Sequence, residues 1–213
     1  MSKFALLDGL PDADTRAVLA ASRRRKYRRN EPICREGEPG DTLHLIDKGH
    51  VAIRAATPQG DTATMRVLGP GHWFGEIAVL EGSPRAATVV ALDATETLSL
   101  HRDVIEQLRG QHLSIDRMLM AAALVEVRRL TRALTDALYT PVPKRLVASL
   151  ADLLAVFDDG VIPLTQDDLA GLCGTTRQTA NEVLQTLVAN GTIALSRGRI
   201  TVLDASKLTR SAR

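Results

Sequence analysis

A glycine, a glutamate and an arginine that could together bind a sugar phosphate lie within eleven positions of one another, from Gly75 to Arg85. Arg85 supplies a planar guanidinium for a phosphate charge, and Gly75 lets the backbone come close to a ligand. Glu76 could accept a hydrogen bond from a ribose hydroxyl. An isolated arginine more often forms a surface ion pair, so Arg85 alone does not define such a site.

A second group of residues, in the last quarter of the chain, predicts two helices that meet at a steep angle. Thr165-Gln166-Asp167-Asp168 is a Thr-x-x-Asp variant of the capping box, which marks a helix start. Ala170 is small enough for the helices to touch, and Gly174 can take the positive φ of a tight turn. Ala180 and Val183 are apolar residues of the second helix that would face the first. This spacing is typical of a helix-turn-helix, whose second helix enters the major groove of DNA.

The residues expected to face DNA follow from that geometry. Thr175-Thr176 can cap the second helix, Asn190-Gly191 ends it, and the apolar stretches 193–195 and 200–203 predict a hairpin, or wing. The exposed start of the second helix would read bases, while wing arginines would contact phosphates. The expected DNA-binding residues are Thr176, Arg177, Gln178, Asn181, Arg197 and Arg199.

Several other kinds of chemistry lack the residues that they need. Cys34 and Cys173 stand 139 positions apart, without the spacing of zinc or iron–sulfur ligands. The five histidines are scattered, with no His-x-His pair for a cupin-type metalloenzyme. We therefore expect neither an enzyme nor a metal site. Haem or redox sensing, with His72 as one candidate haem ligand, stays open as an alternative.

The elements that must position these residues follow two different periods. Between 31 and 100, short apolar stretches alternate with Gly, Pro and Asp clusters, which predicts a small barrel or jelly roll. A helix is expected before it, at 12–21. The basic run 22–29 precedes the expected strands and is interpreted as a solvated face. From about Leu113 the spacing becomes helical for more than 20 residues.

The long helix carries an apolar seam with one polar position. Its members are spaced as in a coiled coil and are Met120, Leu124, Val127, Thr131, Leu134 and Leu138. Such a seam fits a dimer axis, and packing on the chain's own β domain is the alternative. Pro141 and Pro143 are expected to end the helix and begin a hinge, after which 144–157 resumes a helix.

Composition sets only broad limits. A net charge of +2 and a hydrophobic content of 45% are ordinary for a globular protein, and any DNA-binding surface must be locally basic. The longest apolar run, 118–125, has eight residues, against the roughly 18 that a membrane helix needs. We expect a cytoplasmic protein with no membrane association.

The pattern resembles one known family, the CRP/FNR transcription regulators, over nearly the whole chain. Residues 74–89, FGEIAVLEGSPRAATV, resemble the phosphate-binding cassette of cyclic-nucleotide domains, most closely the version in regulatory subunits of cyclic-AMP-dependent protein kinase. The resemblance implies a short helix after Glu76 whose amides point toward the phosphate. The nucleotide-binding residues that it implies are Gly75, Glu76, Ile77, Arg85, Ala86, Ala87 and Thr131.

Two departures from the family pattern bear on the ligand. The residue after the cassette arginine is often Ser or Thr in cyclic-AMP receptors and in cyclic-GMP-selective sites, whereas here it is Ala86. A hydroxyl that would select guanine is missing, so cyclic AMP is favoured over cyclic GMP. The receptors bond adenine with a Thr-Ser pair on the long helix, where this chain has Leu130-Thr131. Thr131 can keep one bond, and Leu130 cannot make the other.

The resemblance therefore implies an α+β protein with three parts. Residues 1–112 would form a double-stranded β-helix (jelly-roll) cyclic-nucleotide-binding domain, 113–140 a dimerisation helix, and 141–213 a winged helix-turn-helix. The expected protein is a homodimer that binds cyclic AMP, a near-palindromic DNA operator and RNA polymerase. Cyclic AMP would shift a pre-existing equilibrium between two arrangements of the DNA-binding domains. A regulator of the same fold that acts without a nucleotide remains the main alternative.

Overall fold

The computed structural model describes residues 3–57, 60–157 and 159–211. Pro58, Gln59 and Asp158, which the sequence places in turns, lie outside these ranges. The chain forms two compact units: Met1–Ile53 with Leu68–Leu130, and Arg54–Val67 with Thr131–Arg213.

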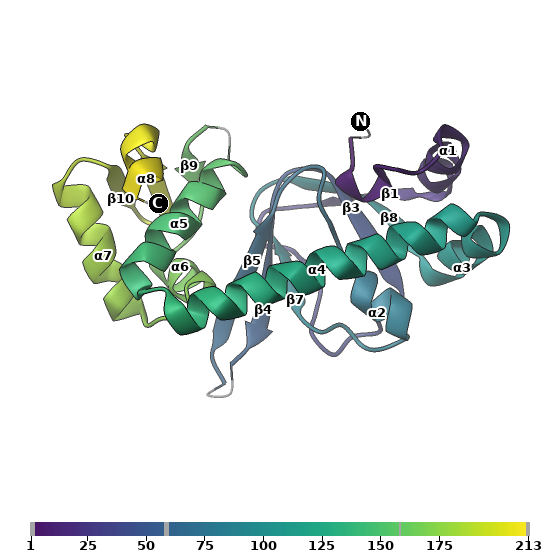
Figure 1. Ribbon diagram of the computed structural model, residues 1–213, viewed down its shortest axis with the longest axis horizontal. Helices are drawn as coiled ribbons and strands as arrows, with labels where there is room; N and C mark the ends of the chain where they lie inside the picture. Colours follow the sequence, from purple (N-terminus) through teal and green to yellow (C-terminus); the bar gives the residue numbers. More distant parts are fainter. Residues whose placement is uncertain (1–2, 58–59, 158, 212–213) are drawn as a thin grey trace. The chain divides into compact units, whose positions relative to one another are not determined.

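Strands from 23 to 101 form the β-roll in two four-stranded sheets, ordered β1-β8-β3-β6 and β2-β7-β4-β5. This arrangement confirms the all-β prediction (Figure 1). The strands are β1 (Arg23–Tyr27), β2 (Pro32–Cys34), β3 (Thr42–Lys48), β4 (Val51–Ala56), β5 (Thr62–Leu68), β6 (Trp73–Phe74), β7 (Thr88–Ala91) and β8 (Thr95–His101). The helical elements of this part are η1 (Ala5–Leu7), α1 (Asp12–Ala21), α2 (Glu76–Glu81) and α3 (Arg102–Gln111).

The core of the first unit joins the β-roll to the start of the long helix α4 (Leu113–Tyr139). Leu43 and Leu45 of β3 and Leu100 of β8 are almost fully buried, and Ile115 and Leu119 of α4 belong to the same cluster. Burying side chains of this size contributes roughly 1.5–3 kcal/mol each. The first turns of α4 are therefore part of the same hydrophobic core as β3 and β8.

The basic run is a strand of the sheet, which corrects the expectation that it precedes the strands. β1 pairs antiparallel with β8 along its whole length. Arg24 Nη1 contacts Asp47 and lies 2.7 Å from Oε2 of Glu96. The side chains of Arg23, Arg25 and Lys26 are exposed, so the run does present a solvated face. The sequence did not predict this strand for two reasons. Residues 23–26 are all basic and so lack the apolar–polar alternation of a strand, and the partner strand β8 lies far along the chain.

Helix α4 is continuous over 27 residues, as the helical spacing predicted (Figure 1). Its seam side chains lie on the surface of the single chain: Met120 is 63% exposed, Leu134 61% and Leu138 65%. Thr131 is exposed as well. Large apolar side chains spaced along one helix and left uncovered are characteristic of a surface that a partner covers.

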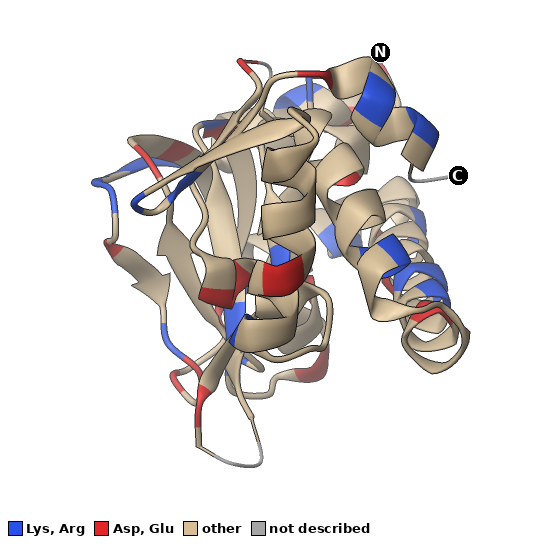
Figure 2. Cartoon of the chain, turned by 90° about the vertical axis from the view of Figure 1, so that its left-hand side faces the viewer, with Lys and Arg blue, Asp and Glu red and all other residues tan. Residues whose placement is uncertain are grey.

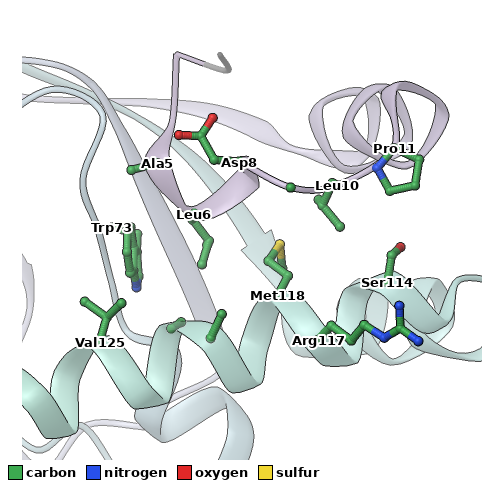
Figure 3. A pocket seen from close by; sticks show the side chains of 13 residues that line it. Ala5, Leu6, Asp8, Leu10, Pro11, Trp73, Ser114, Arg117, Met118 and Val125 are labelled. Carbon is green, nitrogen blue, oxygen red and sulfur yellow. The ribbon is translucent and has the colours of Figure 1, made fainter.

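A cavity of about 380 Å³ lies between the N-terminal segment, Trp73 and the first half of α4. Figure 3 shows Leu6, Trp73 and Met118 around it, with Arg117 and Asp8 among the polar lining residues. Neither Glu76 nor Arg85 lines this cavity. It is therefore a different place from the phosphate-binding cassette.

The part of the second unit that follows α4 is a small helical domain with a three-stranded sheet, ordered β10-β11-β9. Its elements are α5 (Val142–Leu154), β9 (Val161–Ile162), α6 (Gln166–Leu172), α7 (Arg177–Ala189), β10 (Ile193–Ser196), β11 (Arg199–Val202) and α8 (Ala205–Ser211). Pro143 lies in the first turn of α5 rather than in a hinge before it, because first-turn amides need no helical acceptor.

Basic and acidic residues are interspersed over the elements rather than confined to one of them (Figure 2). This distribution agrees with the nearly neutral net charge of +2. Within the part of the chain that the structure describes, no helix has the length and apolar character that crossing a bilayer requires.

His44 is a buried titratable residue of β3. Its ring stacks on Phe74 with centroids 4.8 Å apart, and Nδ1 lies 3.1 Å from Oγ1 of Thr97. Burial, with the nearby charges of Arg85 and Arg25, lowers the pKa of His44 to about 3, although Asp41 acts in the opposite direction. His44 is therefore neutral in the folded protein at neutral pH.

We expect the free energy of unfolding to fall with acidification below about pH 6.5, the ordinary pKa of histidine. In that range the unfolded chain binds a proton at His44 that the folded chain does not, at up to about 1.4 kcal/mol per pH unit. Urea unfolding at pH 7 and pH 5 of wild type and His44→Gln measures this difference. Equal losses in the two proteins would contradict the assignment.

Candidate functional site

Gly75 starts the cassette in a conformation that favours glycine. Its φ is 91°, in the left-handed region, and it immediately precedes α2. A Cβ at this position would lie 2.5 Å from Nη1 of Arg85 and 2.6 Å from the carbonyl oxygen of Thr42. The arginine can therefore lie against the backbone only because Gly75 has no side chain.

Arg85 is buried beside this glycine, with 5% of its surface exposed. Nη2 donates to Oγ1 of Thr42 at 2.6 Å, and Nη1 lies 3.5 Å from the carbonyl oxygen of Gly75. Nε is buried and has no hydrogen-bond partner among the described residues. Since buried donors are almost always paired, a buried cation with an unused N–H is suited to an anionic ligand.

The other expected nucleotide-binding residues of this segment differ in exposure, and their role in binding stays a prediction. Glu76 is buried, Ile77 is 41% exposed, Ala86 is exposed and Ala87 is half-buried. The loop is fixed through its backbone, because the Arg85 amide donates to the carbonyl of Glu38 at 2.8 Å. Thr131 lies on α4 in the second unit, so its expected role in nucleotide binding stays a prediction.

The helix-turn-helix has the caps and the turn that the sequence predicted. The amide of Asp168 donates to Oγ1 of Thr165 at 3.1 Å, and the amide of Thr165 donates to the Asp168 carboxylate at 3.0 Å. Oγ1 of Thr176 caps α7 through the amide of Thr179. Gly174 has a φ of 58°, and Ala180 is fully buried. The predicted capping box and turn glycine are confirmed, and Ala170 is buried as well.

The expected DNA-binding side chains lie at the start of α7 and on the wing. Thr176, Arg177, Gln178, Arg197 and Arg199 are exposed. Asn181 is half-buried, and its Oδ1 accepts a hydrogen bond of 3.1 Å from Nε2 of Gln166. Asn181 is therefore held by α6 and is less free to reach a base than the others.

Arg145 is a structural residue that the sequence patterns did not single out. Its guanidinium donates to the carbonyls of Ala137 at 3.0 Å and Thr140 at 2.8 Å, at the end of α4. It also donates to the carbonyl of Cys173, just after α6, at 2.8 Å. A basic residue soon after a helix end was the only available signal, since cations favour helix C-termini. Thr42, the hydroxyl partner of Arg85, had no sequence signal.

A β-roll with a segment that resembles a phosphate-binding cassette, followed by a winged helix-turn-helix, defines the class of transcription regulators with a cyclic-nucleotide-binding domain. Two family models match the chain: the cyclic nucleotide-binding domain at residues 24–112, and the Crp-like helix-turn-helix domain at residues 144–211.

Similar proteins agree with this class. The cyclic AMP receptor protein of Thermus thermophilus is 32% identical over 98% of this chain and 96% of its own length. The CRP-like cAMP-activated global transcriptional regulator of Mycobacterium tuberculosis is 29% identical over 88% and 87% of the two chains. The structure of the c-di-GMP responsive global regulator CLP of Xanthomonas campestris has a TM-score of 0.74 at 25% identity, over 91% and 100%. The chain belongs to the CRP/FNR family of transcription regulators.

Proposed function

We propose that this chain is a homodimeric transcription regulator whose affinity for DNA is controlled by cyclic AMP. The observation that carries the nucleotide assignment is Arg85, a buried cation beside Gly75 whose Nε has no hydrogen-bond partner among the described residues. A cyclic phosphate would supply the missing acceptor and the opposite charge. Glu76 would accept a hydrogen bond from the ribose hydroxyl.

Cyclic AMP is preferred to cyclic GMP because Ala86 offers no side-chain hydroxyl to guanine. The names of the Thermus and Mycobacterium relatives point to the same ligand. Calorimetric titration of each nucleotide into the purified protein tests the choice. We expect one site per chain and tighter binding of cyclic AMP. The absence of binding would favour a regulator that acts without a nucleotide, and tighter binding of cyclic GMP would contradict the interpretation of Ala86.

Control of DNA binding requires that the nucleotide interact differently with two arrangements of the protein. We propose that Thr131 of α4 donates to or accepts from the adenine of a nucleotide held by the cassette. A contact with α4 links the ligand to the helix that leads into α5 and the DNA-binding domain. The ligand would thereby favour the arrangement that fits DNA.

We expect Thr131→Val to lower cyclic-AMP affinity while preserving or strengthening the dimer. Loss of one hydrogen bond corresponds to roughly 0.5–1.5 kcal/mol, or about two- to tenfold in affinity. Valine would make the seam of α4 wholly apolar. The control is Thr135→Val, since Thr135 lies one turn further along and its hydroxyl donates to the carbonyl of Thr131. If Thr131 serves only to set the seam register, the variant will bind cyclic AMP as the wild type does.

The exposed seam of α4 supports the homodimer. Met120, Leu124, Val127, Leu134 and Leu138 are each at least 49% exposed in the single chain. A second copy of the same helix would bury all of them and form the axis of a two-fold dimer. A monomeric wild type in sedimentation equilibrium would contradict this assembly.

In such a dimer the two α7 helices would enter successive major grooves, about 34 Å apart, so the operator would be a near-palindrome. Arg177 is suited to guanine and Gln178 to adenine, whereas Arg197 and Arg199 are suited to phosphates. A regulator of this family is also expected to contact RNA polymerase and to act in the cytoplasm.

A further inference from the structure

The carboxylate of Asp168 accepts hydrogen bonds both from its own helix start and from two neighbouring strands. Through Oδ2 it caps its own helix, accepting from the backbone amide of Thr165 at 3.0 Å, and it also accepts from Oγ1 of Thr165 at 2.7 Å. Through Oδ1 it accepts from Oγ1 of Thr64 at 2.6 Å and from Nη2 of Arg54 at 3.0 Å. Arg54 and Thr64 lie on the consecutive strands β4 and β5, and residues 54–67 form one compact unit with residues 131–213. We call Arg54, Thr64 and Asp168 the polar latch.

The polar latch is packed rather than a loose surface contact. Thr64 is 2% exposed, and the side chains of Asp168 and Arg54 are 11% and 29% exposed. The hydroxyl of Thr64 has both its roles filled, because it donates to Asp168 and accepts from Nε of Arg54 at 3.3 Å. Charge-assisted hydrogen bonds in a partly buried site are stronger than exposed ion pairs.

Gly171 brings the backbones themselves together, one turn after Asp168. A Cβ at Gly171 would lie 2.7 Å from the amide nitrogen of Thr64 and 3.1 Å from its carbonyl oxygen. Helix α6 can therefore approach β5 at this distance only with glycine here. This close backbone approach is independent of the ion pair. It is a second observation that α6 packs directly on β5.

The electrostatics of Asp168 agree with this geometry. Burial alone would raise the pKa of Asp168, but hydrogen bonds from Thr64 and Thr165 and the charge of Arg54 lower it below the ordinary value. The carboxylate is therefore ionised at neutral pH and keeps its pairing with Arg54.

The strands that hold Asp168 belong to the same sheet as the strand that leaves the cassette. In the order β2-β7-β4-β5, β7 begins at Thr88, directly after Ala86 and Ala87, and β4 is its neighbour. The first turn of α6 also contacts two residues of α7: Asp167 lies 3.3 Å from Arg177, and Gln166 donates to Asn181. The first turn of α6 thus contacts both the latch residues of β4 and β5 and the expected base-reading helix α7.

We propose that the polar latch is the positioning contact through which the nucleotide-binding sheet controls the helix-turn-helix. The proposal rests on the proposed function and names its regulatory connection within one chain. Asp168 touches neither DNA nor nucleotide in this role; it holds the start of α6, which in turn holds α7. A change in the sheet would move the helix pair only while the latch is intact.

The test removes the latch from the strand side and leaves the sequence of the helix-turn-helix unchanged. Thr64→Val deletes one hydroxyl, and Arg54→Gln deletes the cation. Thr62→Val is the matched control, because Thr62 is an exposed threonine of the same strand. The readout is the ratio of DNA affinities with and without saturating cyclic AMP, on an operator selected with wild type. Thermal unfolding checks that each variant is folded.

We expect each latch variant to lower this ratio at least about threefold, with Thr62→Val unchanged and Arg54→Lys retaining part of the wild-type ratio. We also expect the double variant Arg54→Gln/Thr64→Val to lose less than the product of the single losses, because both residues act on one carboxylate. An unchanged or increased ratio in folded latch variants of a nucleotide-responsive wild type would overturn the latch alone. A wild type whose DNA affinity does not respond to cyclic AMP would overturn both the latch and the proposed function.

Discussion

Arg85→Ala is expected to lose most of the affinity for cyclic AMP. A phosphate bound without its cation loses charge-assisted bonds worth roughly 1.5–3 kcal/mol, or about 10- to 150-fold in the dissociation constant. The loss is expected to lie at the upper end because Arg85 is 5% exposed, which leaves little room for water to replace it. Calorimetric titration of cyclic AMP into wild type and variant measures the difference.

Two further variants separate the role of the guanidinium from a general loss of structure. Arg35→Ala removes an exposed arginine that pairs with Glu38 at 3.6 Å, and it should leave nucleotide affinity unchanged. Glu76→Ala should weaken binding by deleting the acceptor of the ribose hydroxyl. Cyclic-AMP affinity that is equal in wild type and in folded Arg85→Ala would remove the basis for the nucleotide site.

Arg177→Ala is expected to reduce affinity for the operator by about 1–3 kcal/mol and to relax preference at one base position of each half-site. Arg177 is the first residue of α7, and its side chain is 68% exposed. Its ion pair with Asp167 spans 3.3 Å between two exposed side chains, so releasing it should oppose DNA binding only weakly. Selection of binding sites from random DNA by wild type and variant shows the change.

The matched variant for this prediction is Arg197→Ala, in the turn between β10 and β11. A phosphate contact carries no sequence information, so this variant should weaken all sequences alike and flatten the salt dependence. If wild type and Arg177→Ala recover identical motifs, Arg177 does not read a base.

The helix-turn-helix could be predicted because its signals are local, and the cassette could be recognised because its resemblance to a known motif lies within one short stretch, residues 74–89. Gly75 and Arg85 are ten positions apart, and the capping box joins residues three apart. In both cases one short stretch of chain fixes the backbone conformation and supplies the side chains. The length of α4 was predictable for a similar reason, since helical spacing is visible in any window of a few turns.

Contacts between distant parts of the chain could not be predicted. Arg85 and Thr42 are 43 positions apart, Arg145 and Cys173 28, and Arg54 and Asp168 114. A single sequence contains no signal that pairs such residues. The strand β1 was misplaced for the same reason, because its partner β8 begins at Thr95 and its own residues show no alternation.

The most direct test of nucleotide control is the affinity of the wild-type protein for its selected operator, measured by fluorescence anisotropy with and without saturating cyclic AMP at one salt concentration. Allosteric coupling typically corresponds to about 1–3 kcal/mol, or roughly 5- to 150-fold. We expect cyclic AMP to tighten binding to a near-palindromic operator within this range. Equal affinity in the presence and absence of cyclic AMP would contradict nucleotide control of DNA binding.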